Sequence, residues 1–324
     1  MKTYPLKLVP VTKKIIWGGN YIAENFDIGE KGESVAEAWM MTVRPDGVNM
    51  IDNGEYKGMD LSEYIEKTGA KAVYGDFEAF PLLIKLIDAN DRLSVQVHPD
   101  DEYAKNNGLD AGKTEMWYVV DAQPGAQLVS GLSVDKAPTY EEIEARNSNG
   151  TLSDMLNYVD VKKGDCFFIP AGLVHAIGKG IVIAEIQQNS NTTFRLYDYD
   201  RTDKDGNKRE LHIEKAAQVI KTSFDEKAIV NKVIKSTDDE TVTTLCDCSL
   251  FAAIKHEICN NAVSVFNGGT MLNILCLDGD GYIEYDGEEY ELKKGFTYLI
   301  PADMGNFKVT GKSEKLEIIV SYAK

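Results

Sequence analysis

Two short stretches of the chain, residues 91–120 and 164–178, show the alternation of apolar and polar positions that is typical of half-buried strands. In the first stretch every second residue from Leu93 to Val97 is apolar, and successive side chains of a strand point to opposite faces. Pro99 predicts the end of this strand, because a residue that precedes proline is held extended. The second stretch is an aromatic and apolar run that leads into a Pro-x-Gly turn. The pattern therefore predicts two strand ends that carry polar groups.

The remaining apolar patterns predict a mainly β chain with a few helices. Apolar runs and alternation predict further strands at 33–45, 81–89, 115–120, 161–170 and 180–187. Helical spacing and capping residues predict helices at 60–69, 138–150, 151–159 and 212–221. The second and third of these helices form a predicted helical insertion near 132–160. From 243 to 324, short strands separated by Asn-Gly-Gly and Asp-Gly turns predict a sandwich or barrel.

A repeat links the two halves of the chain. Residues 162–175 (KKGDCFFIPAGLVH) match residues 293–306 (KKGFTYLIPADMGN) at a constant offset of 131. Where the first copy has His175, the second has Asn306. We interpret the repeat as two related β-barrels, of which only the first keeps a metal ligand at this position. A catalytic domain at 1–222 would then be joined to a degenerate domain at 243–324 by a charged connecting segment, residues 223–242.

Composition narrows the range of partners. The 324 residues carry a formal net charge of −17, with a sequence pI of about 4.7. This charge argues against nucleic acid and anionic membranes, which attract a basic face, and an anionic substrate would need its own local cations. No apolar run reaches the ~18 residues of a transmembrane helix, and the N-terminus lacks the apolar core of a signal peptide. Five scattered cysteines favour a reduced, cytoplasmic setting.

Four polar side chains lie near the predicted strand ends. Gln96 and His98 share one face of their strand, Glu115 opens the next strand, and His175 follows the Pro-x-Gly turn. These side chains could converge as a metal site with nitrogen and oxygen ligands. A single histidine is usually a satisfied core or surface residue, and Glu115 alone could be a carboxylate at a strand edge. We favour the metal site because two of only four histidines lie at such strand ends. The other two are expected to be structural or at the surface: His212 and His256.

Longer motifs resemble a known family. The spacing Gly-x5-Pro-x-Gly-x2-His from Gly164 to His175 is identified as the second conserved motif of the cupin superfamily. The segments 96–101 (QVHPDD), 112–115 (GKTE) and 187–201 (QQNSNTTFRLYDYDR) are similar to the short bacterial form of type I mannose-6-phosphate isomerase, in the same order. The resemblance covers essentially the whole chain. It implies a mainly β fold of two cupin-type jelly-roll barrels, with the helical insertion in the N-terminal one.

The same resemblance implies an activity and its residues. The family is a zinc-dependent enzyme that interconverts mannose 6-phosphate and fructose 6-phosphate, with one zinc ion per chain. The implied zinc ligands are Gln96, His98, Glu115 and His175, and the implied active-site arginine is Arg195. Isomerisation moves a proton between C1 and C2 through an enediol(ate), so a positive centre must stabilise the developing oxyanion. The ligand set has no thiolate, so Fe²⁺, Mn²⁺ or Co²⁺ could bind in place of zinc.

Three cationic side chains are candidates for contacts with the substrate. As a catalytic residue, Arg195 could hold the phosphate or stabilise the enediolate, or it could instead form a loop salt bridge with Asp198 or Asp200. Lys113, close to a predicted ligand, could bind phosphate or carry a proton, or it could be solvated. Lys85, in a buried strand, could bind substrate or be a snorkelling lysine at a sheet edge. The sequence does not identify the general base.

Two other functions stay open at this level. A metal-dependent cupin oxidoreductase, such as an Fe²⁺ dioxygenase, usually keeps more open metal positions and needs no cluster of cations. A non-catalytic sugar-binding cupin would fit an eroded site, whereas the motifs of the first barrel are intact. We expect a phosphorylated sugar as the small-molecule partner, and a monomer or weak homo-oligomer.

Overall fold

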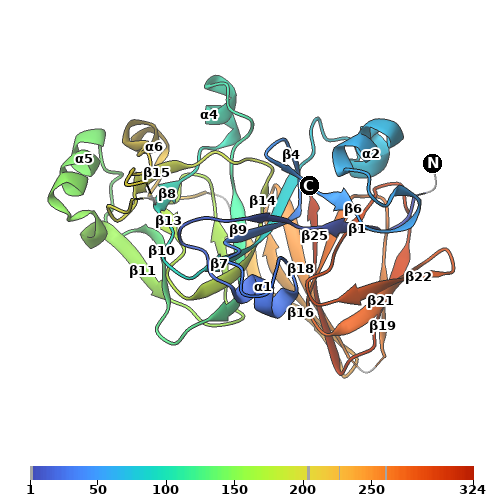
Figure 1. Ribbon diagram of the computed structural model, residues 1–324. Helices are drawn as coiled ribbons and strands as arrows, with labels where there is room; N and C mark the ends of the chain where they lie inside the picture. The colour runs from blue at the N-terminus through green and yellow to red at the C-terminus, as the bar shows by residue number, and fades with distance from the viewer. Residues whose placement is uncertain (1–2, 203–204, 226, 260) are drawn as a thin grey trace.

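Two lobes built from antiparallel strands lie side by side in the computed structural model, which describes residues 3–202, 205–225, 227–259 and 261–324 (Figure 1). The mainly β prediction is confirmed, because helices are few and short and lie around the sheets. None of the described helices is long and apolar enough to span a membrane.

The N-terminal lobe pairs a six-stranded sheet with a five-stranded sheet. The six-stranded sheet has the order β12 (Cys166–Ile169), β9 (Glu115–Ala122), β14 (Ile181–Gln188), β7 (Leu82–Ala89), β3 (Glu37–Met41) and β2 (Val11–Lys13). The five-stranded sheet has the order β11 (Leu156–Asp160), β10 (Gln127–Leu132), β13 (His175–Ala176), β8 (Val95–Val97) and β15 (Phe194–Tyr197). A separate hairpin joins β4 (Val43–Arg44) to β5 (Gly47–Val48).

The C-terminal lobe pairs an eight-stranded sheet with a four-stranded sheet. The larger has the order β16 (Ile229–Ser236), β17 (Glu240–Asp247), β18 (Phe251–Cys259), β25 (Lys315–Ala323), β20 (Leu272–Asp278), β23 (Thr297–Ile300), β1 (Leu6–Val9) and β6 (Met50–Ile51). The smaller has the order β19 (Val263–Phe266), β24 (Phe307–Gly311), β21 (Asp280–Tyr285) and β22 (Glu288–Lys293).

Six α-helices of the described residues lie between or outside these strands. They are α1 (Tyr21–Phe26), α2 (Leu61–Thr68), α3 (Ala70–Tyr74), α4 (Asp101–Asn106), α5 (Tyr140–Asn149) and α6 (Ile213–Val219), with 3-10 turns at Gly54–Tyr56 and Leu152–Met155. The helix predicted at 60–69 is confirmed: Asp60 caps α2 by accepting from the Glu63 amide, and Gly69 follows its last residue.

The predicted helical insertion is confirmed only in its first half. α5 lies between β10 and β11, and Thr139 and Glu142 form a capping box at its start. The second predicted helix, 151–159, is wrong. That stretch forms a 3-10 turn and then β11, which pairs with β10. Its apolar positions fit helical spacing, but the free edge of β10 supplies backbone partners that the local pattern does not reveal.

The division into domains stays a prediction. Several strands and one core cross the predicted domain boundaries. The segment 223–242 holds β16 and the start of β17, which are strands of the eight-stranded sheet. From the other end of the chain, β1 pairs with β23 and also with β6. One apolar core contains residues from both lobes, such as Leu6, Tyr118 and Ile319. The N-terminal part of the chain therefore contributes β1 and β6 to the sheet of the C-terminal lobe, and the two lobes share a core.

The two copies of the sequence repeat form the same structure. β12 and β23 begin and end at positions that are 131 residues apart, the offset of the repeat. Each strand follows a glycine with positive φ, Gly164 at 90° and Gly295 at 86°, a conformation that glycine adopts most readily. In the second copy the Asn306 side chain accepts a hydrogen bond from the Gly268 amide. The repeat therefore keeps a turn in both lobes, while the side chain at its end differs.

The buried carboxylate of Glu240 is the centre of a hydrogen-bond cluster in the C-terminal lobe. Glu240 accepts hydrogen bonds from His256 at 2.8 Å, Ser264 at 2.6 Å and Lys235 at 2.5 Å. Burial acts to raise the pKa of Glu240, but these three donors outweigh it and lower the pKa to about 2. His256, expected to be structural or at the surface, thus has a partner within this lobe.

This carboxylate predicts a specific pH dependence of stability. Because its pKa is depressed on folding, the stabilisation is complete above the ordinary value of 4.5 and is lost as the pH falls toward 2. We expect the free energy of unfolding of Glu240→Gln to lie below that of the wild type by about 1–3 kcal/mol near pH 6. The difference should shrink as the pH falls, as measured by urea unfolding followed by circular dichroism. The exposed Glu288→Gln serves as control, and a Glu240→Gln deficit that stays constant from pH 6 to pH 3 would contradict the assignment.

Candidate metal centre

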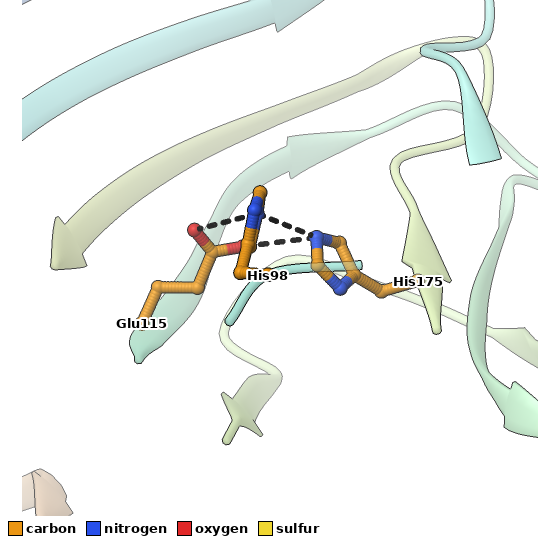
Figure 2. A group of neighbouring side chains, drawn as sticks. All are labelled: His98, Glu115 and His175. Carbon is orange, nitrogen blue, oxygen red and sulfur yellow. Dashed lines mark hydrogen bonds and ion pairs between the residues drawn. The ribbon is translucent and has the colours of Figure 1, made fainter. Parts of the chain in front are cut away.

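Three side chains from three strand ends converge inside the N-terminal lobe. His98 directly follows β8, Glu115 opens β9 and His175 opens β13. Figure 2 shows them pointing toward one another, and their ligand atoms all lie within 4.8 Å of one another. The two Nε2 atoms are 3.1 Å apart, and Oε1 of Glu115 lies 3.3 Å from Nε2 of His175. Each of the three residues is at most 1 % exposed.

Strand pairing and the turn before His175 bring these side chains together. His175 pairs with Gln96 across β13 and β8, and Glu115 pairs with the last residue of β12 across β9. The turn before His175 depends on Gly172, whose φ is +94° and whose amide donates to the His98 carbonyl at 2.9 Å. A Cβ at this glycine would lie 2.9 Å from the Val219 carbonyl oxygen. The Pro-x-Gly motif therefore joins the two ligand strands by a backbone hydrogen bond.

A backbone carbonyl orients each imidazole through Nδ1, the ring nitrogen that faces away from the cluster. Nδ1 of His98 lies 2.8 Å from the Thr192 carbonyl oxygen, and Nδ1 of His175 lies 2.8 Å from the Leu173 carbonyl oxygen. A carbonyl can only accept, so each Nδ1 carries the proton and each Nε2 presents a lone pair to the cluster. Burial lowers the pKa of His98 well below its usual range and that of His175 to about 4. Both rings are therefore neutral at pH 7, which is the form that binds metals.

Glu115 supplies a carboxylate that has no hydrogen-bond donor. It is 0 % exposed, and both of its oxygens lack a hydrogen-bond partner. Burial and the negative charge of Glu185 raise its pKa above the ordinary value, against the opposing effect of the Lys113 ammonium 3.3 Å away. A buried carboxylate that has no hydrogen-bond donor and lies beside two imidazole lone pairs is a potential metal ligand. Two neutral imidazoles and this carboxylate fit a divalent cation such as Zn²⁺.

The fourth predicted ligand, Gln96, lies beside the cluster. Its side-chain nitrogen is 3.3 Å from Nε2 of His175, and its oxygen accepts from Ser94 at 3.5 Å. Rotation of the amide by 180° would exchange the two atoms and place the oxygen toward the cluster. The role of Gln96 as a ligand stays a prediction.

A layer of buried charges continues from the cluster along the sheet. Lys85 on β7 is 4 % exposed and pairs with Glu185 on β14 at 3.0 Å and Glu37 on β3 at 3.8 Å. Burial acts to lower the pKa of Lys85, but the two carboxylates outweigh it and raise the pKa. The alternative of a snorkelling or edge lysine is therefore wrong, since β7 lies between β14 and β3. Lys113 is buried to the same degree, so the alternative of a solvated lysine is wrong as well.

The sequence reasoning missed Glu185. Its side chain lies between Lys85 and the Trp117 indole, which donates to it at 3.2 Å. Burial acts to raise its pKa, but the positive charges of Lys85 and Lys113 outweigh this and lower it. A single acidic residue inside the apolar run at 181–186 was the signal that could have revealed it, because such a residue is almost never buried without a partner.

Arg195 lies on β15, next to the strand that carries Gln96. Its Nε donates to Ser94 at 3.3 Å, and its Nη1 donates to the Glu210 carbonyl at 2.7 Å. The alternative of a loop salt bridge is not what the described residues form. Asp198 pairs with Arg201 and Arg209, and Asp200 pairs with Lys208. His212 accepts from the Arg195 amide at 3.2 Å. Arg195 is therefore linked to Gln96 through Ser94.

These contacts predict how histidine substitutions affect metal binding. We expect His98→Ala and His175→Ala each to remove the tightly bound metal ion, because two of three buried ligands cannot hold a divalent cation in place. His256→Ala, the control, should keep its metal, since this histidine pairs with Glu240 in the other lobe. Metal content of the purified proteins, measured by plasma mass spectrometry, tests this. A His175→Ala protein that retains one equivalent of metal would show that the ligand assignment is wrong.

Comparisons with known proteins agree with this site and fold. The family model described as phosphomannose isomerase type I, catalytic domain, matches residues 6–124, and the model described as mannose-6-phosphate isomerase, cupin domain, matches residues 241–323. The chain is 40% identical to the mannose-6-phosphate isomerase ManA of Bacillus subtilis, over 97% of this chain and 98% of that protein. It is 38% identical to the mannose-6-phosphate isomerase of Streptococcus mutans, over 98% of each.

Solved structures show the same similarity. The crystal structure of mannose 6-phosphate isomerase from Bacillus subtilis has a TM-score of 0.85 and 34% identity, and the match covers 98% of this chain and 99% of that one. A phosphomannose isomerase variant from Salmonella typhimurium has a TM-score of 0.77 at 18% identity, with 99% of each chain covered, and supports the fold alone. The expected cupin-type fold is confirmed, and the chain belongs to the type I phosphomannose isomerase family.

Proposed function

We propose that this chain interconverts mannose 6-phosphate and fructose 6-phosphate at the cluster of His98, Glu115 and His175. The observation that carries the proposal is the convergence of these three buried groups beside Lys113, in a chain of the type I phosphomannose isomerase family. An aldose–ketose isomerase needs a positive centre at the developing oxyanion and cations for the phosphate. The same lobe holds the candidate metal cluster and the cations Lys113 and Arg195, which supports the proposal. Neither of the other functions considered from the sequence, an oxidoreductase or a non-catalytic sugar-binding protein, has an observation in its favour.

The metal ion is proposed to be zinc, one per chain, with Gln96 as the fourth ligand. In support, His98, Glu115 and His175 form the one cluster of potential ligands found among the residues that the structure describes. Nitrogen and oxygen donors suit zinc, although Fe²⁺, Mn²⁺ and Co²⁺ accept the same donors. A bound metal ion would supply positive charge beside the substrate oxygen on which the enediolate charge develops.

The chain's own cations would bind and orient the substrate. With a net charge of −17 the protein repels an anionic sugar phosphate, so local positive charge is required. We propose that Lys113 carries a proton or contacts the phosphate, and that Arg195 holds the phosphate or stabilises the enediolate through its planar guanidinium. Lys85 already faces Glu185 and Glu37, so its charge is largely matched before substrate binds. We therefore propose that Lys85 contacts the substrate while it stays paired with Glu185 and Glu37.

The proposal extends to location. Sugar phosphates are metabolites of the cell interior, and none of the five cysteines, all among the described residues, is in a disulfide, which fits a reducing compartment. We propose a cytoplasmic enzyme, with a phosphorylated sugar as its small-molecule partner. The expectation of a monomer or weak homo-oligomer stays a prediction.

An assay coupled to glucose-6-phosphate formation tests the proposed activity directly. We expect the purified protein to turn over mannose 6-phosphate. Dialysis against a chelator should remove nearly all turnover, because the chelator competes with the proposed ligands for the ion, and adding back Zn²⁺ should restore it. Oxygen consumption, measured in parallel, should be absent. Full turnover in the chelated protein would exclude the metal-dependent mechanism, and no turnover with any divalent metal would exclude the isomerase.

Substitution of Arg195 separates substrate chemistry from metal binding. We expect Arg195→Ala to keep its metal but to lose about 10²–10³-fold in kcat, as for removal of one preorganised donor to a developing anion. Arg195→Lys should recover only part of this, because an ammonium cannot bind an anion bidentately. Arg146→Ala is the matched control, since Arg146 also donates to a backbone carbonyl, that of Thr151, but lies at the end of α5. An Arg195→Ala enzyme with unchanged kcat would remove this residue from the mechanism.

A further inference from the structure

The two metal-ligand histidines differ in what holds their outer nitrogen. The carbonyl that accepts from His175 belongs to Leu173, two residues away in the same turn. The carbonyl that accepts from His98 belongs to Thr192, 94 residues away in the chain. It lies in the 188–192 segment, which comprises the last residue of β14 and the residues that follow it. The orientation of His98 therefore depends on where this separate segment lies.

The 188–192 segment is held from inside the lobe by Gln187. This side chain is 0 % exposed, and its amide nitrogen donates to the Ser190 carbonyl at 2.6 Å and to the Gln188 carbonyl at 2.7 Å. The buried Ser190 hydroxyl in turn accepts from the Thr192 amide at 3.3 Å. Three side-chain hydrogen bonds thus fix the turn that ends in the carbonyl facing His98.

The same segment is hydrogen-bonded to residues 111–114, the stretch that carries Lys113 and leads into β9. The Ser190 hydroxyl donates to the Ala111 carbonyl at 3.0 Å. The Gln188 side-chain oxygen accepts from the Thr114 amide at 2.9 Å, and the Gln188 amide donates to the Thr114 carbonyl at 3.1 Å. A displacement of the segment would therefore be transmitted to His98 on one side and to the Lys113–Glu115 stretch on the other.

We propose that Gln187 is a positioning residue that acts on His98 through the 188–192 segment and thereby sets the metal affinity of the site. With the Thr192 carbonyl in place, His98 carries its proton on Nδ1 and presents Nε2 as a ligand. If the carbonyl moves, the ring is free to rotate and to adopt the tautomer with the proton on Nε2, in which Nε2 has no lone pair to offer the metal. The inference rests on the proposed metal site, and it assigns a positioning role to Gln187, which pairs with Glu115 across β14 and β9.

The test compares Gln187→Met and Ser190→Ala with a matched control, Asn273→Leu. Asn273 is also 0 % exposed, its side-chain nitrogen also donates two hydrogen bonds, to Thr297 at 2.8 Å and to the Tyr298 carbonyl at 3.2 Å, and its oxygen, like that of Gln187, has no partner. It lies in the C-terminal lobe. Each full-length variant is stripped of metal, and the dissociation constant for Zn²⁺ is measured by competition with a chromophoric chelator. Melting temperature of the metal-free protein, kcat and KM are measured in parallel.

We expect Gln187→Met to raise the Zn²⁺ dissociation constant by about 10–100-fold and to lower kcat at saturating Zn²⁺ more than it changes KM. Ser190→Ala should show the same direction, and it keeps the test decisive if Gln187→Met does not fold. Asn273→Leu should lower the melting temperature without changing Zn²⁺ affinity. Wild-type affinity in both the Gln187 and the Ser190 variants, or an equal loss in Asn273→Leu, would overturn the inference but leave the isomerase intact. A wild-type protein that binds no metal would overturn the metal site itself.

Discussion

A carboxylate that is removed from water without a hydrogen-bond donor destabilises a folded protein by several kcal/mol unless a cation lies beside it. Both oxygens of Glu115 are buried and without a hydrogen bond, next to two imidazoles whose lone pairs face them. The ammonium of Lys113, 3.3 Å from Oε2 of Glu115, offsets part of the negative charge of this carboxylate. The rest of the N-terminal lobe is arranged to keep these groups in place: two carbonyls orient the rings, and Gly172 joins the turn before one histidine to the backbone of the other. This arrangement supports the proposal that a divalent cation binds between the three side chains.

The two lobes show what is needed for a site and what is needed only for the fold. Both keep the glycine turn and the strand that follows it, at the same offset along the chain. In the C-terminal lobe the corresponding residue, Asn306, hydrogen-bonds to a backbone amide, and the buried carboxylate Glu240 is fully satisfied by a histidine, a serine and a lysine. A buried acid with three donors stabilises the lobe. A buried acid with none, as in the N-terminal lobe, leaves a place for an ion.

The predictable part of the structure was the part encoded locally. Pro99 and the Pro-x-Gly turn mark strand ends, and alternation puts Gln96 and His98 on one face, so Gln96, His98 and His175 could be chosen as candidates from neighbouring residues. The choice of Glu115 depended mainly on the family resemblance. The helix predicted at 151–159 is wrong because residues 156–160 pair with the edge of β10, and the paired residues are 24 to 33 positions apart in sequence. The placement of β1 in the sheet of the C-terminal lobe is set by contacts nearly 300 residues apart. Glu185 was missed because its partners, Lys85 and Trp117, are neighbours only across three strands.

A crystal structure of the metal-loaded protein, with anomalous data collected at the zinc absorption edge, tests the account most directly. The account predicts a single anomalous peak at bonding distance, about 2 Å, from Nε2 of His98, Nε2 of His175 and a carboxylate oxygen of Glu115. A fully loaded crystal whose peak lies elsewhere, such as beside Glu240 and His256, would contradict it, and so would a Glu115 carboxylate that makes no contact with the ion.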